Sequence, residues 1–155
     1  MFRLFKPEPF RDGQRGEFRR SGCYSKGSLA PCGTYRLVLA GSREAPGPMA
    51  LELAKELPDR FKSLMPKIQT GLFGHYVPYK EAADAGERTG SPRPSVASPE
   101  AVWPHVTHAH VLAEPLEGVM TVEIAFRLAW DVEHTVGARF QNWQFVDLNG
   151  SVRGQ

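Results

Sequence analysis

Three histidines, His105, His108 and His110, lie close together in the second half of the chain. Side chains two residues apart in a β-strand point to the same face, so His108 and His110 would lie side by side in a strand. Imidazole pairs of this kind are common metal ligands, but two imidazoles make only part of a coordination shell. A metal site would need further ligands from residues such as His75, Glu133 or His134. The alternative is that both histidines are ordinary strand residues.

A second group of reactive side chains lies in the segment Trp130-Asp131-Val132-Glu133-His134. Two carboxylates and an imidazole could share general acid and base roles if a pocket changed their pKa values. Aspartate is also common in turns, where its side chain binds nearby backbone amides, so a structural or recognition role is the simpler interpretation. We therefore name Trp130, Asp131, Glu133 and His134 as candidate binding residues and none as catalytic. Core packing beneath the turn is the expected role of Trp130.

A third group, His75, Tyr76 and Tyr79, lies near the end of a predicted helical region. Large amphipathic side chains dominate the energetics of many protein interfaces, so these three residues are further binding candidates. The same side chains could instead cover the edge of the core. Both interpretations stay open at this point.

Motifs of the common catalytic classes are missing from the sequence. There is no G-x-S-x-G nucleophile elbow, no G-x-x-x-x-G-K-[ST] phosphate loop, no H-E-x-x-H and no G-x-G-x-x-G. Common hydrolases, nucleoside triphosphatases and dinucleotide-dependent enzymes are therefore disfavoured. We expect no cofactor and favour a protein that is not an enzyme.

The composition predicts one domain. The chain has 155 residues, of which 41% are hydrophobic, enough for one core but not for two independent domains, so 1–155 is treated as a single domain. No stretch approaches the roughly 18 consecutive apolar residues of a membrane-spanning helix. The opening residues, Met1 to Pro7, are too short and too charged for a signal-peptide core, so we expect a cytoplasmic location. The two cysteines, Cys23 and Cys32, form neither a disulfide framework nor a CxxC pair, and in that location they are expected to be free thiols.

The charge is spread unevenly along the chain. The net charge is +2, and residues 1–36 hold eight basic residues against three acidic ones. No nucleic-acid-binding motif accompanies this excess. Nucleic acid is therefore a disfavoured partner.

The first half of the chain predicts strands followed by helices. Residues 16–41 predict three short strands, broken at Gly22 and at Pro31-Cys32-Gly33, in an antiparallel meander because the connections are short. From Pro46 the apolar period becomes helical. Pro58 and Pro66 lack a backbone donor, so two or three helical segments are expected. The predicted buried stripe consists of Leu53, Leu57, Phe61, Leu64, Ile68 and Leu72.

The second half predicts a loop and a second meander. Glycine, proline and small polar residues at about 84–99 predict a flexible surface loop that is too poor in apolar side chains to pack. A short helix after Ser98 and strands at 106–113 and 119–130 follow, and Asp131 to His134 form the next turn. The alternation of the second strand is typical of a sheet with one packed face. It places Val122, Ile124, Phe126, Leu128 and Trp130 on one side and Thr121, Glu123, Ala125 and Arg127 on the other. The strand after that turn ends in a tight turn at Asn142-Trp143. The expected fold is α+β: an N-terminal antiparallel β meander, a proline-segmented helical layer, and a C-terminal antiparallel β meander, with the helices packed on a sheet face.

Several motifs resemble uncharacterised bacterial domains of unknown function. They are L-P-x-R-F from Leu57, the helix ending H-Y-x-P-Y from His75, the C-terminal hairpin W-D-x-E-H-x-x-G from Trp130, and L-N-G-S-V from Leu148. The resemblance covers most of the chain. Some such families are similar to small proteins encoded beside toxins, which implies an interaction or immunity-like role.

The sequence thus leaves three hypotheses. The leading one is a non-catalytic macromolecule-binding protein with another protein as its partner, and an immunity-like role is its more specific form. The second is a metal-binding protein or metal-dependent enzyme that uses His108 and His110 with Glu133 or His134. The third is a homo-oligomer formed by pairing of the last strand.

Overall fold

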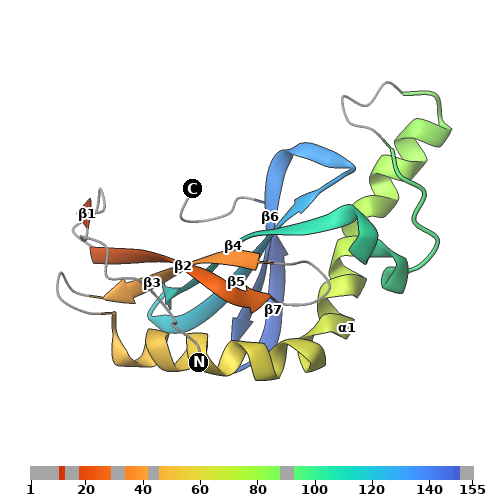
Figure 1. Cartoon of the computed structure of the whole chain (residues 1–155). Coiled ribbons are helices and arrows are strands. Elements are labelled where there is room, and N and C mark those ends of the chain that lie inside the picture. Colours follow the sequence, from red (N-terminus) through yellow and green to blue (C-terminus); the bar gives the residue numbers. More distant parts are fainter. Residues whose placement is uncertain (1–10, 13–17, 29–33, 42–45, 88–92, 151–155) are drawn as a thin grey trace.

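One mixed sheet and one long helix make up most of the structure (Figure 1). In this computed structural model, the described residues are 11–12, 18–28, 34–41, 46–87 and 93–150. The α+β prediction, with helix packed on a sheet face, is confirmed. The strands among the described residues are β1 (Arg11–Asp12), β2 (Phe18–Ser28), β3 (Thr34–Gly41), β4 (Val106–Leu116), β5 (Val119–Leu128), β6 (Asp131–Gln141) and β7 (Gln144–Asn149).

The described strands lie side by side in chain order, and among them only β3 and β4 pair in parallel. A parallel pair needs a long crossover connection, and here the chain passes through helix α1 (Pro48–Asp84) and the short 3₁₀-helix η1 (Pro99–His105). The two predicted meanders are therefore the two halves of one sheet, joined by the β3–β4 pair. Strand β2 continues through Gly22, which pairs with Leu37, so the break expected there is wrong. The turn expected at Pro31-Cys32-Gly33 lies outside the described residues.

Helix α1 is one continuous element of 37 residues, with Pro58, Pro66 and Pro78 inside it. The expected division into separate segments is wrong. A helix can absorb the missing donor and the ring clash of a proline by bending, and α1 changes direction between its yellow and green parts (Figure 1). The apolar stripe runs past the prolines without a gap, which gives the helix a packing reason to continue. Its buried members include Leu57, Phe61, Leu64, Ile68, Leu72 and Tyr76.

The core lies between this stripe and one face of the sheet. Strand β5 gives it the predicted alternate residues, Val122, Ile124, Phe126 and Leu128. The opposite face of β5 is also buried in its middle, at Thr121, Glu123 and Ala125. The expectation of a single packed face is therefore wrong for the centre of this strand.

The β5–β6 connection consists of Ala129 and Trp130, so the turn lies two residues earlier than expected. Asp131 begins β6 and pairs with Leu128, whereas Thr135 pairs with Arg127, the preceding residue of β5. The three residues between Asp131 and Thr135 are therefore extra residues of β6, a bulge in the ladder. This bulge turns His134 back toward the start of its own strand.

The region at 84–99 packs on helix α1 in its described part. The Tyr76 hydroxyl donates to the Pro94 carbonyl oxygen at 2.9 Å, and Val96 is buried. Arg93 pairs with Asp84 at 3.1 Å. The region thus has more apolar packing than expected, while its flexibility stays a prediction. No helix in the described segments combines the length and apolar character needed to span a membrane.

Candidate functional site

The carboxylate of Asp131 joins the end of helix α1 to the start of strand β6. Tyr79 Oη donates to its Oδ2 at 2.7 Å, and His134 Nδ1 lies 2.9 Å from its Oδ1. His75 Nε2 lies 3.8 Å from Oδ2. We call His75, Tyr79, Asp131 and His134 the Asp131 cluster. Asp131 itself is only 4% exposed, so three side chains replace the water that a surface carboxylate would bind.

Local structure explains how each member reaches this carboxylate. His75 and Tyr79 are four residues apart on α1, so they lie on one helix face, and their rings stack with centroids 5.3 Å apart. His134 arrives through the bulge in β6. The cluster therefore depends on a helix face and on an irregular strand start.

Trp130 selects the neutral tautomer of His75. The Trp130 indole Nε1 donates to His75 Nδ1 at 3.0 Å. A nitrogen that accepts a hydrogen bond carries no proton, so neutral His75 bears its proton on Nε2, which faces Asp131. Trp130 is 1% exposed and packs edge-on against Tyr76, with ring centroids 5.4 Å apart.

The electrostatics of the cluster follow from burial and from Asp131. Burial alone would raise the pKa of Asp131, but the hydrogen bonds from Tyr79 and His134 and the nearby histidine charges together outweigh it and hold this pKa below its usual value. The hydrogen bond and the charge of Asp131 raise the pKa of His134. Burial lowers the pKa of His75, against a smaller opposing effect of Asp131. Burial, followed by the hydrogen bond to Asp131, raises the pKa of Tyr79 to about 12.

These shifts indicate the protonation state of each group at neutral pH. Asp131 is ionised, Tyr79 is a neutral donor and His75 is neutral. His134 can take up a proton, and 59% of its side chain is exposed. An imidazole oriented by a carboxylate can act as a general base, and it can equally present one fixed polar group to a binding partner.

Five of the seven candidate binding residues meet in this region: His75, Tyr79, Trp130, Asp131 and His134. Tyr76 is buried beside Trp130, and its hydroxyl bonds the backbone at Pro94. Glu133 is exposed on the bulge. The structure thus joins two groups of candidates that the sequence presents separately.

The predicted pairing of His108 with His110 is wrong. His108 pairs with Phe126 of β5, but His110 pairs with Ala125, so Ala109 is an extra residue in the ladder. Directly opposed residues share a face, which puts His108 on the core face and His110 on the opposite one. The His108 ring stacks on Phe126 at 5.2 Å. No group of three or more potential ligands suited to a metal ion occurs among the described residues.

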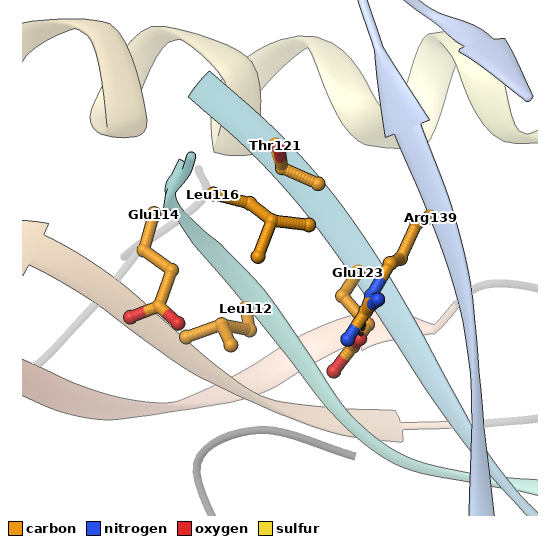
Figure 2. A pocket seen from close by; sticks show the side chains of 6 residues that line it. All are labelled: Leu112, Glu114, Leu116, Thr121, Glu123 and Arg139. Carbon is orange, nitrogen blue, oxygen red and sulfur yellow. Dashed lines mark hydrogen bonds and ion pairs between the residues drawn. The ribbon is translucent and has the colours of Figure 1, made fainter. Parts of the chain in front are cut away.

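A buried ion pair, not predicted from the sequence, lies on the other sheet face. Arg139 Nε donates to Glu123 Oε2 at 2.7 Å, and Glu123 is 2% exposed. Figure 2 shows the two side chains converging from neighbouring strands, beside Leu112 and Leu116. The two residues are direct cross-strand partners. Their opposite charges could have predicted the ion pair, but only if the register of β5 and β6 had been known.

Gly137 makes room for this ion pair. A Cβ at Gly137 would lie 2.7 Å from Cγ and Cδ of Glu123. Such contacts are far inside ordinary van der Waals distance, so any larger residue would push the Glu123 side chain aside. The glycine of the W-D-x-E-H-x-x-G motif is therefore needed for Glu123 to take its buried position.

Comparisons with known proteins give a family but no activity. No curated protein and no solved structure matches the chain. A family model described as a domain of unknown function, DUF6985, matches residues 36–153, a span that holds the whole Asp131 cluster. The expected membership in a domain of unknown function is confirmed, whereas a bacterial origin and the hairpin motif stay predictions. The chain belongs to the DUF6985 family of domains of unknown function.

Proposed function

We propose that this domain binds another protein through the end of its β5–β6 hairpin, at the exposed bulge residues Val132, Glu133 and His134, the hairpin-end surface. One observation carries the proposal. The buried carboxylate of Asp131 holds the exposed imidazole of His134 at 2.9 Å, and Tyr79 of the helix holds that carboxylate in turn.

Fixing an exposed side chain favours binding for an entropic reason. Most exposed side chains sample several rotamers, and ordering a rotamer-rich one at an interface opposes association by about 0.5–1.5 kcal/mol. The His134 imidazole is already oriented by its own protein. A partner that bonds the outward Nε2 would meet a side chain with little rotamer freedom left to lose.

The neighbouring residues supply contacts of other kinds. Val132 is 63% exposed, a high value for a large apolar side chain, and Glu133 is exposed as well. Three residues cover much less than the roughly 800 Å² that a partner typically buries in a stable complex. The hairpin-end surface would thus be the centre of a larger interface.

A second copy of the chain is the less favoured partner. In the described sheet β7 is the last strand, which could pair with another β7. Its ladder passes from Phe140↔Phe145 to Arg139↔Asp147, so Val146 is an extra residue there. Bulges on edge strands hinder edge-to-edge pairing. An immunity-like role and a cytoplasmic location are further predictions, and they rest on the sequence.

Site-specific photo-cross-linking tests the proposal. A photoreactive residue at position 132 should capture a partner, and the same residue at position 146 should not. Val146 is 48% exposed and lies toward the opposite end of β6, so it is a matched control. The captured protein is then purified and titrated. We expect Val132→Asp and His134→Ala to weaken binding at least tenfold and Val146→Asp to leave it unchanged.

Two results would contradict the proposal. One is equal loss of affinity in the Val132 and Val146 variants, which would mean that the contact lies elsewhere. The other is turnover of a simple hydrolase substrate that disappears in folded His134→Ala protein, which would make His134 a general base of an enzyme.

A further inference from the structure

We infer that His75 makes the junction between helix α1 and the β5–β6 hairpin sensitive to acid: a proton added at its Nδ1 removes the acceptor of the Trp130 indole and so breaks this hydrogen bond between the hairpin end and the helix. This inference does not depend on the proposed binding function, and it can be tested without a partner.

The two ring nitrogens of His75 leave no position for a second proton. Nδ1 accepts from Trp130 Nε1 at 3.0 Å, and Nε2 lies 3.8 Å from Asp131 Oδ2. One neutral tautomer, protonated at Nε2, satisfies both contacts. In the imidazolium both nitrogens are donors, so Nδ1–H would face the indole N–H, and two donors cannot form a hydrogen bond.

Asp131 is poorly placed to retain a charged His75. Its oxygens already accept from Tyr79 at 2.7 Å and from His134 at 2.9 Å. The 3.8 Å approach of His75 is the longest of the three contacts. The described groups that face His75 are Tyr79 on its own helix and Asp131 and His134 on β6, with Glu133 acting on Tyr79.

The order of protonation strengthens this effect. The pKa of His134 is raised, so His134 takes its proton first as the pH falls and puts a positive charge near His75. Burial and that charge lower the pKa of His75, and Asp131 opposes them only in part. A base with a lowered pKa in the folded state stabilises the fold fully above its unfolded value of about 6.5 and loses this contribution as the pH falls.

The residue that loses its hydrogen bond, Trp130, belongs to the core. Trp130 is 1% exposed and forms half of the Ala129-Trp130 connection between β5 and β6. Displacing its indole therefore disturbs the turn that places Asp131 and the bulge after it. Protonation of one side chain on the helix is thereby transmitted to the exposed end of the hairpin.

The three tryptophans provide a test with internal controls. Trp103 Nε1 donates to the Gln69 amide oxygen at 3.1 Å, and Trp143 Nε1 donates to the Glu56 carboxylate at 3.0 Å. Only Trp130 donates to an imidazole among these three. A ¹H–¹⁵N spectrum of the assigned indole groups, recorded from pH 8 to pH 4.5, follows each bond separately. We expect the Trp130 signal to move with a midpoint below about 6.5, while that of Trp103 stays in place.

Two variants connect the transition to His75. An asparagine can offer its side-chain oxygen close to the position of Nδ1 and does not titrate, so His75→Asn should keep the Trp130 signal constant over this range. His134→Asn removes the neighbouring positive charge, so the Trp130 midpoint should move to higher pH.

The inference would be overturned by a Trp130 transition that survives in His75→Asn, by an immobile Trp130 signal in the wild type, or by Trp103 moving together with Trp130, which reports global unfolding. If His75→Asn does not fold, the ¹⁵N spectrum of the wild-type imidazoles still tests the inference. It must show neutral His75 protonated at Nε2, and protonation at Nδ1 would contradict the proposed geometry.

Discussion

The hydroxyl of Tyr79 and the carboxylate of Asp131 form a 2.7 Å hydrogen bond between residues 52 positions apart in the chain. Tyr79 belongs to the last turns of α1, and Asp131 is the first residue of β6. This bond connects two elements that no short loop joins. The site therefore exists only when the helix and the sheet are packed together.

Replacing Tyr79 by phenylalanine tests the strength of this connection. The variant keeps the ring stacked on His75 but removes a donor from a buried ionised carboxylate, a change that typically costs about 1–3 kcal/mol. We expect the free energy of unfolding in urea to fall by that amount with an unchanged slope against denaturant. Lys80→Ala is the control, because Lys80 is exposed and its ion pair with Asp84 lies at the surface. Equal effects of the two substitutions would show that the bond to Asp131 adds no stability.

Periodic patterns in the sequence predicted the core better than the connections. Helical spacing from Leu57 to Leu72 and strand alternation from Val122 to Leu128 each identified side chains that are buried. The prolines misled the prediction because tertiary packing keeps α1 continuous through them. The parallel pairing of β3 with β4 could not be predicted from the sequence either, because it depends on contacts across the whole helical crossover.

The effect of His134 on stability should depend on pH in a defined way. The folded-state pKa of His134 is raised, so its contribution is complete below the unfolded value of about 6.5 and is lost as the pH rises through the folded value. The pKa of Asp131 is lowered, so its contribution is complete above about 3.9 and is lost as the pH falls through the folded value. The stability difference between wild type and His134→Ala should therefore be greatest between about pH 4 and pH 6.5.

Urea unfolding of both proteins in steps of half a pH unit measures this difference. Added salt should reduce it, because His134 is exposed and its interaction with Asp131 is screened. A difference that does not vary with pH would mean that His134 acts through packing and not through its charge.

The candidate site was predictable in parts only. The sequence identified the helix end from His75 to Tyr79 and the segment from Trp130 to His134 as separate candidates. Their contact depends on the tertiary pairing of α1 with the hairpin, which no local pattern contains. A bulge misled the prediction elsewhere: one extra residue, Ala109, moves His110 to the face opposite His108 and removes the predicted pair of ligands.

Gly137→Ala should destabilise the domain through Glu123. The new methyl group would lie 2.7 Å from two carbons of a side chain that is buried and paired with Arg139. Overpacking a core typically costs about 1–3 kcal/mol, and disturbing the buried ion pair adds to this. Thermal or urea unfolding measures the loss. Gly74→Ala is the matched control, since a Cβ at Gly74 meets nothing within 4 Å and alanine favours a helix, so it should stabilise slightly.

A double-mutant cycle separates the contact with Glu123 from a general intolerance of alanine at position 137. In a Glu123→Ala background the obstructing carbons are absent, so Gly137→Ala should cost markedly less than in the wild type. The same cost in both backgrounds would remove Glu123 from the explanation and point to the backbone of β6.

The Asn142-Trp143 turn sets backbone strain against side-chain anchoring. Both residues have positive φ, 49° and 59°, as a two-residue hairpin turn of type I′ requires, and a bulky side chain is costly there. The Trp143 indole compensates by donating to Glu56 at 3.0 Å and lying 5.6 Å from the Arg60 guanidinium.

Trp143→Gly would relieve about 1–2 kcal/mol of strain and lose about 2–3 kcal/mol of packing and hydrogen bonding, so we expect net destabilisation of about 1 kcal/mol. Asn142→Gly, an exposed change in the same turn, should alter stability by only a few tenths of a kcal/mol, because asparagine already tolerates this conformation. Urea unfolding of the two variants decides the balance, and a Trp143→Gly protein more stable than wild type would show that strain, not anchoring, dominates this turn.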